Sequence, residues 1–212
     1  MQSRGFEQVS IQDVLDAMGT SKGAFYHYFG SKADLLDAVV ERLVDAGVEQ
    51  VARGLDDPNR TAVEKFERFF AGLADYKAER RDLILGFMRA WLSDENAVVR
   101  EHLRRGLVRR LQPVMTTIVR QGLAEGVFRV SSPDASARVL ISLIQGLNED
   151  ATDLFLALDS GEISFEFLEA RLLSYAQAFE RILDADPGSL KFADTSVIRD
   201  WYHWAQARKE QA

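Results

Sequence analysis

The chain has 212 residues with a formal net charge of −7, and 47% of them are hydrophobic, which is enough for one or two compact units with a hydrophobic core. It contains no cysteine, which excludes disulfides, thiolate metal sites and thiol redox sensors. The sequence shows neither a signal-peptide region nor a run of the ~18 apolar residues that a membrane helix needs, so we expect a soluble, cytoplasmic protein without a membrane partner.

The first predicted elements are two short helices. Apolar residues recur at three- and four-residue steps along almost the whole chain, which predicts an all-α fold. Ser10 followed by Asp13 resembles a capping box and predicts a first short helix that ends at Gly19. A second short helix is expected at about 22–29.

A long helix is predicted to follow, because Ser31 and Asp34 repeat the start signal. Residues 56–59 contain a proline and form a break, after which Thr61 is expected to cap another helix. The predicted apolar stripe of the long helix comprises Leu35, Leu36, Val39, Val40, Leu43 and Val44.

Further helices are expected through the second half of the chain. The helix over 97–125 should be interrupted or kinked near Pro113, because proline removes a backbone hydrogen-bond donor, and Gly126 should end it. The run Ser131-Ser132-Pro133 should begin the next helix. The other predicted helices cover roughly 82–92, 133–158, 165–184 and 197–204.

Two short helices joined by a glycine turn and followed by a long helix form the layout of a helix-turn-helix with a connector. The second helix is short enough to enter the major groove of DNA, which is about 12 Å wide. No carboxylate lies between Asp16 and Asp34, and the basic or imidazole side chains of Lys22, His27 and Lys32 fall inside that window. A local cationic surface is therefore expected on an acidic protein.

The residues of this region resemble a known family. The segments 9–14, 18–29 and 31–36, with an aromatic Tyr-x-Tyr-Phe cluster followed by Ser-Lys and a pair of leucines, look like the DNA-binding signature of the TetR family of bacterial transcriptional regulators. The resemblance is close over residues 5–45. Beyond them it is limited to the helical layout and to the segment 125–129.

The resemblance implies a role for each residue of the motif. Gly19 would make the turn, Tyr26 would donate its hydroxyl to a phosphate, and Lys32 would contact another phosphate. Phe25 and Phe29 would belong to the core, whereas Tyr28 could serve either role. The implied DNA-binding residues are Ser10, Thr20, Ser21, Lys22, Gly23, Ala24, Tyr26, His27 and Lys32.

The resemblance also implies a domain organisation and partners. A helix-turn-helix domain is expected at 1–45, a helical ligand-binding and dimerisation domain at 46–186, and a C-terminal helical extension at 187–212. The helices near 133–158 and 165–184 would form a homodimer. This dimer would bind a palindromic DNA operator and be released by a small-molecule effector, with repression favoured over activation.

An apolar or amphipathic effector is expected in a cavity of the helical domain, because the family keeps a ligand cavity there. Each residue proposed to line it could equally be ordinary core, and this alternative stays open. No cofactor is expected. The proposed lining residues are Phe87, Met88, Trp91, Met115, Phe128 and Phe155.

The chain departs from the family pattern at its start. The family has a full helix before the position of Gly5, whereas only four residues precede it here. We therefore expect the chain to be shortened and the DNA-binding domain to be incomplete at its N-terminus. The alternative is a helical ligand-binding or protein-interaction module that no longer binds DNA. The intact segment 20–29 argues against that alternative.

An enzyme is not expected. Helical bundles can hold metals through Glu-x-x-His pairs, but only His203 among the three histidines has a carboxylate three residues before it. The sequence also lacks a glycine-rich phosphate loop and a nucleophile motif, so no catalytic or metal residues are predicted. A basic stretch on one helix is expected to be a solvated face. Its members are Arg100, Arg104, Arg105, Arg109 and Arg110.

Overall fold

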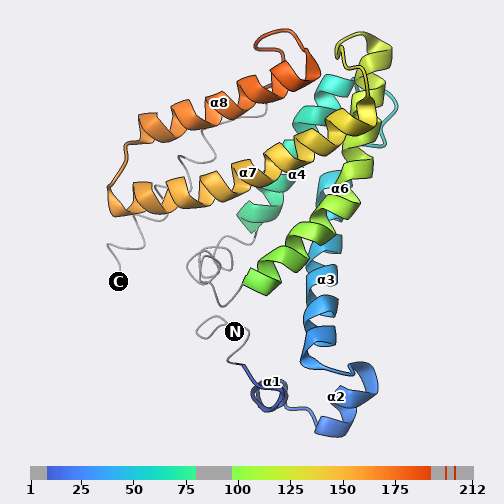
Figure 1. The fold of residues 1–212 in the computed structure, drawn as a ribbon, viewed down its shortest axis with the longest axis vertical. Helices are drawn as coiled ribbons and strands as arrows, with labels where there is room; N and C mark the ends of the chain where they lie inside the picture. The colour runs from blue at the N-terminus through green and yellow to red at the C-terminus, as the bar shows by residue number, and fades with distance from the viewer. Residues whose placement is uncertain (1–8, 80–96, 192–198, 200–202, 204–212) are drawn as a thin grey trace. The chain divides into compact units, whose positions relative to one another are not determined.

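The structure, a computed structural model, describes residues 9–79, 97–191, 199 and 203. The helices of these ranges confirm the predicted all-α class (Figure 1). The helices expected at 82–92 and 197–204 lie outside the described residues. In chain order the helices are α1 (Ile11–Met18), α2 (Lys22–Tyr28), α3 (Lys32–Ala52), α4 (Ala62–Glu79), α6 (Ala97–Glu125), α7 (Pro133–Ser160) and α8 (Phe165–Leu183).

The chain divides into two compact units. Among the described residues, the first unit contains those up to 50 and those from 76 to 109, and the second contains 51–75 together with the residues from 110 onward. The first unit thus holds α1, α2, most of α3 and the N-terminal part of α6. The second holds most of α4, the rest of α6, and α7 and α8.

In the first unit, α3 packs on α6 through a narrow apolar face. Leu36, Val40 and Val44 are buried at four-residue intervals. The wider predicted stripe is wrong in part, because Val39 is 45% and Leu43 39% exposed. These two positions are rotated away from the face that an i, i+4 series forms on a helix. The partly buried residues packed on this cluster are Val48, Val99, Leu103 and Leu107.

The second unit has an aromatic core between α4 and the helices that follow it. Phe66 is fully buried, and its ring centroid lies 5.1 Å from that of Phe70, 6.3 Å from that of Phe128 and 6.0 Å from that of Phe179. Edge-on and tilted aromatic pairs of this kind stabilise a core beyond their buried area. Leu168 and Leu172 of α8 form a second cluster, which packs α8 on α7.

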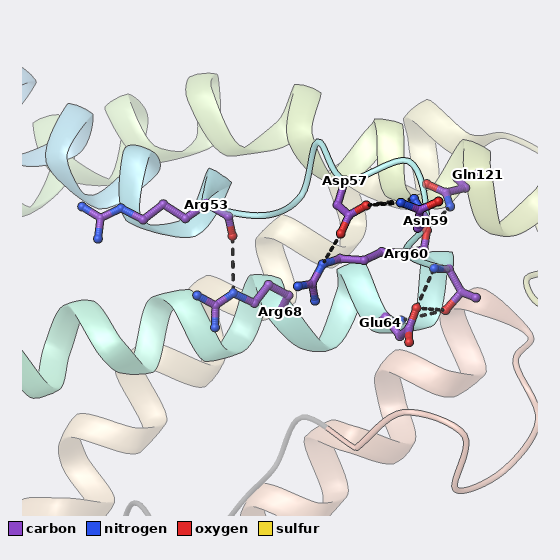
Figure 2. A network of polar contacts seen from close by, with 8 residues as sticks. Arg53, Asp57, Asn59, Arg60, Glu64, Arg68 and Gln121 are labelled. Carbon is purple, nitrogen blue, oxygen red and sulfur yellow. Dashed lines mark hydrogen bonds and ion pairs between the residues drawn. The ribbon is translucent and has the colours of Figure 1, made fainter.

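A polar network holds the start of α4 (Figure 2). The backbone N–H of Thr61 donates to Glu64 at 2.7 Å, and the Thr61 hydroxyl accepts from the Glu64 N–H at 3.3 Å. This reciprocal pair confirms Thr61 as the predicted cap. The amide of Gln121 donates to the Arg60 carbonyl at 2.8 Å, and the Arg60 guanidinium pairs with Asp57 at 3.4 Å. The loop before α4 is therefore tied to α6.

Two helix boundaries follow the sequence signals. Pro113 lies inside α6, which is not interrupted there, so that part of the prediction is wrong, while a kink at Pro113 stays a prediction. Proline fits helical φ and removes only one backbone donor, so a helix held by packing on both sides of it can continue. Gly126 ends α6 with a left-handed φ of 75°, and the Ser132 hydroxyl accepts from the Ala135 N–H at the start of α7, 3.4 Å away. Both boundaries are confirmed.

Candidate nucleic-acid interface

The first helix of the site, α1, is closed at both ends by local contacts. At its start the Ser10 hydroxyl accepts from the Asp13 N–H at 3.1 Å, and the Asp13 carboxylate accepts from the Ser10 N–H at 2.8 Å. This capping box confirms the sequence prediction. At its end Gly19 adopts a left-handed φ of 61°, and its N–H donates to the Asp16 carbonyl at 3.4 Å. The turn is thereby fixed immediately before α2.

One side chain anchors α2. Its N-cap, Ser21, accepts from the Ala24 N–H at 3.2 Å, and Phe25 is the residue of this helix that is buried. Leu15 is the buried residue of α1. The Phe25 ring also lies 5.6 Å from the ring of Phe29, which agrees with the expectation that Phe25 is core. Because a single residue anchors it, the rest of α2 is available to contact another molecule.

The outward side of α2 carries aromatic and basic groups. Tyr26 is 47% and Tyr28 77% exposed. The Lys22 ammonium lies 5.9 Å from the centroid of the Tyr26 ring, and the His27 ring meets the Tyr28 ring edge-on at 4.9 Å. Ser21, Lys22, Gly23, Ala24 and His27 are exposed as well.

Gly23 faces open space. Among the described residues, a Cβ placed on it would have the Ser21 hydroxyl oxygen as its neighbour within 4 Å, at 3.9 Å. Its φ is not in the left-handed region that favours glycine. Neither the backbone nor the internal packing of the chain therefore requires glycine here.

The connector helix α3 begins next to the start of α1. The Lys32 ammonium donates to the Val9 carbonyl at 3.0 Å, which joins the first turn of α3 to the residue before the α1 cap. The flanking carboxylates are engaged locally, since Asp16 accepts from Gln12 at 2.7 Å and Asp34 from the Ser31 hydroxyl at 2.9 Å. The residues between them in the sequence, 17–33, include no acidic side chain.

The structure places the predicted DNA-binding residues at different points. Those from 20 to 27 lie together on the turn and on α2, with Thr20 half-buried. Ser10 lies at the other end of α1, where its hydroxyl is already engaged with Asp13. Tyr28, which the sequence left open, is exposed because Phe29 occupies the position four residues after Phe25 and packs on it. The DNA-contact roles themselves stay predictions.

The residues predicted to line an effector cavity are described only in part. Met115 and Phe128 are both fully buried. The Phe128 ring packs directly on the backbone of Gly122, where an added Cβ would lie 2.0 Å from a ring carbon. Phe87, Met88 and Trp91, together with the side chain of Phe155, lie outside the described residues.

Three arginines of the basic stretch of α6 pair with carboxylates. Arg104 and Arg105 donate to Glu101 at 2.7 and 2.5 Å, and Arg109 donates to Glu41 of α3 at 2.6 Å. Hydrogen bonds from Arg104 and Arg105 lower the pKa of Glu101 to about 2. These pairs agree with the solvated face that the sequence predicts.

Two histidines of the described part of the chain contact neighbouring side chains. His102 pairs with Asp37, and His27 stacks on Tyr28. No group of three or more histidine, aspartate or glutamate side chains among the described residues could hold a metal ion. The helices described there are also too short or too polar to cross a membrane.

Two short helices around a left-handed glycine, the second anchored by one aromatic side chain and otherwise exposed, followed by a long helix, define a helix-turn-helix protein. The model of the bacterial regulatory proteins of the tetR family matches residues 1–39. The N-terminal part of the chain is therefore a helix-turn-helix domain of the TetR family of regulatory proteins.

Curated relatives are similar over part of the chain. The transcriptional repressor KstR2 of Rhodococcus jostii is 29% identical over 108 residues, which cover 46% of this chain and 53% of the relative. The transcriptional activator FasR of Mycolicibacterium smegmatis is 38% identical over 72 residues, or 31% of this chain and 33% of the relative. The chain spans about half the length of the first curated relatives it matches. All of these relatives are named as transcriptional regulators.

Solved structures resemble the fold over most of the chain. A putative TetR-family regulator from Syntrophomonas wolfei aligns with a TM-score of 0.57 at 17% identity, covering 93% of this chain and 88% of that one. NemR of E. coli in its reduced form aligns with a TM-score of 0.53 at 22% identity, covering 87% and 92%. The likeness in fold therefore extends beyond the helix-turn-helix.

Proposed function

We propose that the chain regulates transcription by binding duplex DNA through α2 and the turn before it. The observation that carries this proposal is the surface of α2, where every residue other than Phe25 is exposed. An amphipathic surface helix normally buries an apolar stripe of three or four residues in every two turns. A short helix held by one residue leaves nearly its whole surface to contact the major groove.

In this proposal the residues of α2 and the start of α3 contact different parts of the DNA. Gly23 and Ala24 allow the helix to approach the base edges closely, because they add little or no side chain. Lys22 and Lys32 neutralise phosphates, and the Tyr26 hydroxyl donates to a phosphate oxygen. The absence of acidic side chains between Asp16 and Asp34 avoids repulsion by the DNA backbone.

We also propose that two copies of the chain bind a palindromic operator. A single helix-turn-helix reads few base pairs, and dimers of this class place two recognition helices about 34 Å apart, one turn of DNA. The support is on α7 and α8, which expose Val139 by 51%, Phe167 by 56% and Leu173 by 48%. These apolar side chains fit the predicted helix-pair interface of a homodimer.

The regulator is proposed to repress, and to be released by a small apolar or amphipathic effector that the helical domain binds. This part rests on the family resemblance. An effector that binds the folded protein raises its thermal midpoint by mass action, and one that prefers the DNA-free conformation weakens DNA binding. A compound that raises the thermal midpoint and also weakens DNA binding supports the proposed release by an effector. Compounds that raise the midpoint without changing DNA affinity contradict it.

Selection from a pool of random duplexes tests DNA binding for any operator sequence. We expect enrichment of an inverted repeat. Lys22→Met should then weaken binding to the selected duplex, since it removes a phosphate contact from each subunit. Lys191→Met is the matched control, because it removes the same charge from an exposed lysine of the second unit. No enrichment, or equal loss in the two variants, would contradict the proposal.

A further inference from the structure

Gly106 of α6 lies against Val44 of the connector helix α3. A Cβ on Gly106 would lie 3.0 Å from a methyl carbon of Val44, which is fully buried, and this is shorter than an ordinary contact. The φ of Gly106 is not left-handed, and glycine inside a helix lowers helix stability relative to alanine. The backbone therefore gives no reason for glycine at this position, whereas the contact with Val44 does.

Polar contacts lie on both sides of this point. His102 pairs with Asp37, and Arg109 donates to Glu41 at 2.6 Å. Their side chains are between 38% and 65% exposed, and exposed ion pairs contribute little to stability because water and salt screen them. The distance between α3 and α6 therefore depends on their buried apolar contacts, and at Gly106 the contact with Val44 leaves little room for a side chain.

We propose that Gly106 is a positioning residue for DNA binding: it sets how closely α3 packs on α6, and α3 carries the DNA-binding helices. This inference rests on the proposed binding of DNA as a dimer. Three residues separate the end of α2 from the start of α3, and Lys32 in the first turn of α3 donates a hydrogen bond to the Val9 carbonyl. A shift of α3 would move both recognition helices of a dimer and change their separation, without altering any residue of the α2 surface.

A double-mutant cycle tests the contact without DNA. The shift that Gly106→Ala causes in the midpoint of thermal unfolding should be about 2–4 °C less favourable in the otherwise wild-type chain than in the Val44→Ala background, because the new methyl group meets Val44. In the Val44→Ala background the opposing methyl groups are gone, so only the helix preference for alanine should remain. Gly146→Ala is the control, because a Cβ there would have its nearest neighbour, the Tyr175 hydroxyl, at 3.8 Å.

The positioning role is tested by a DNA-binding measurement that a change in stability alone would not affect. Binding is measured to the selected inverted repeat and to the same duplex cut to one half-site, at a temperature where all variants are folded. Gly106→Ala should weaken binding to the inverted repeat about tenfold or more and leave binding to the half-site unchanged. The double variant Val44→Ala with Gly106→Ala should recover the affinity of Val44→Ala.

Each other outcome overturns the inference. Equal losses on both duplexes would mean that Gly106→Ala damages the α2 surface itself, and no loss on either would mean that α3 is positioned by something else. Failure of Val44→Ala to rescue binding would remove Val44 from the explanation. If the wild-type protein bound neither duplex, the proposed function would fail and the positioning role with it, while the unfolding cycle would still report on the contact.

Discussion

Gly23 and Gly122 show how one residue type serves two purposes. A Cβ on Gly122 would lie 2.0 Å from the Phe128 ring, whereas a Cβ on Gly23 would meet nothing closer than 3.9 Å. Gly122 is required by the packing of this chain. Gly23 has no such internal reason, which is expected where a second molecule must approach the backbone closely.

Gly23→Ala should separate stability from DNA binding. Alanine is favoured over glycine in a helix by about 1 kcal/mol, and the methyl group has room in the free protein, so the free energy of unfolding should stay equal or rise. DNA affinity should fall, because the methyl group occupies the space between α2 and the base edges. Denaturant unfolding and fluorescence anisotropy measure the two effects. Unchanged DNA affinity would contradict a close approach at Gly23.

Gly122→Ala should destabilise the second unit. Forcing an extra methyl group into a packed core costs about 1–3 kcal/mol, and here the obstacle is the fully buried ring of Phe128. The free energy of unfolding, measured with urea, should fall by that amount. Gly146→Ala, with its nearest neighbour at 3.8 Å, should not be destabilised. Equal behaviour of the two variants would show that Phe128 moves aside freely.

Some single-residue properties could be predicted from the sequence and others could not. Phe25 was expected to be core because the resemblance places it on the inner side of α2, and it is buried. The exposure of Tyr28 could not be predicted, since Tyr28 and Phe29 lie three and four residues after Phe25 and either could pack on it. Only the three-dimensional path of the chain decides between them.

At the scale of helices, starts and ends were the most predictable features. Ser10, Thr61 and Ser132 cap helices as expected, because caps depend on contacts within three or four residues. The predicted apolar stripe of α3 included Val39, which is exposed, because burial at that position depends on which helix packs beside it. Pro113 inside α6 shows the same limit, because tertiary packing determines whether a helix continues past a proline.

The salt-bridged turn of α6 should be sensitive to acid. Arg104 and Arg105 lower the pKa of Glu101 from 4.5 to about 2, so its contribution to stability is fully present above pH 4.5 and is lost as the pH falls towards 2. Glu101→Gln removes this contribution. The thermal midpoint of the wild type should therefore fall more over this pH range than that of the variant. Parallel curves would show that the pairs do not persist in solution.

At the scale of the whole molecule, the fold class followed from the periodicity of apolar residues, and the helix-turn-helix from the local motif. The interior of the helical part was less accessible to prediction. Met115 and Phe128 were proposed as lining residues, but an aromatic or methionine on an inward helix face has the same sequence pattern in a cavity wall and in a filled core. The buried state of these two side chains required the structure.

The proposed dimer makes a prediction at this scale. Leu173→Lys on α8 should shift the chain towards monomer, because it places a charge on an apolar face that the partner would cover. Leu123→Lys is the matched control: Leu123 is 42% exposed and Leu173 48%, but Leu123 lies near the end of α6. Light scattering measures the mass of both variants. A wild-type monomer, or a Leu173→Lys dimer, would contradict the proposed interface.

Binding of the wild-type protein to the selected duplex and to a scrambled duplex, across a series of salt concentrations, tests the central claim most directly. With Lys22 and Lys32 each neutralising a phosphate in both subunits, the logarithm of the binding constant should fall with the logarithm of salt at a slope of about −4. The selected duplex should bind about a thousandfold more tightly than the scrambled one. Equal affinity for the two duplexes at every salt concentration would contradict sequence-specific DNA binding by this chain.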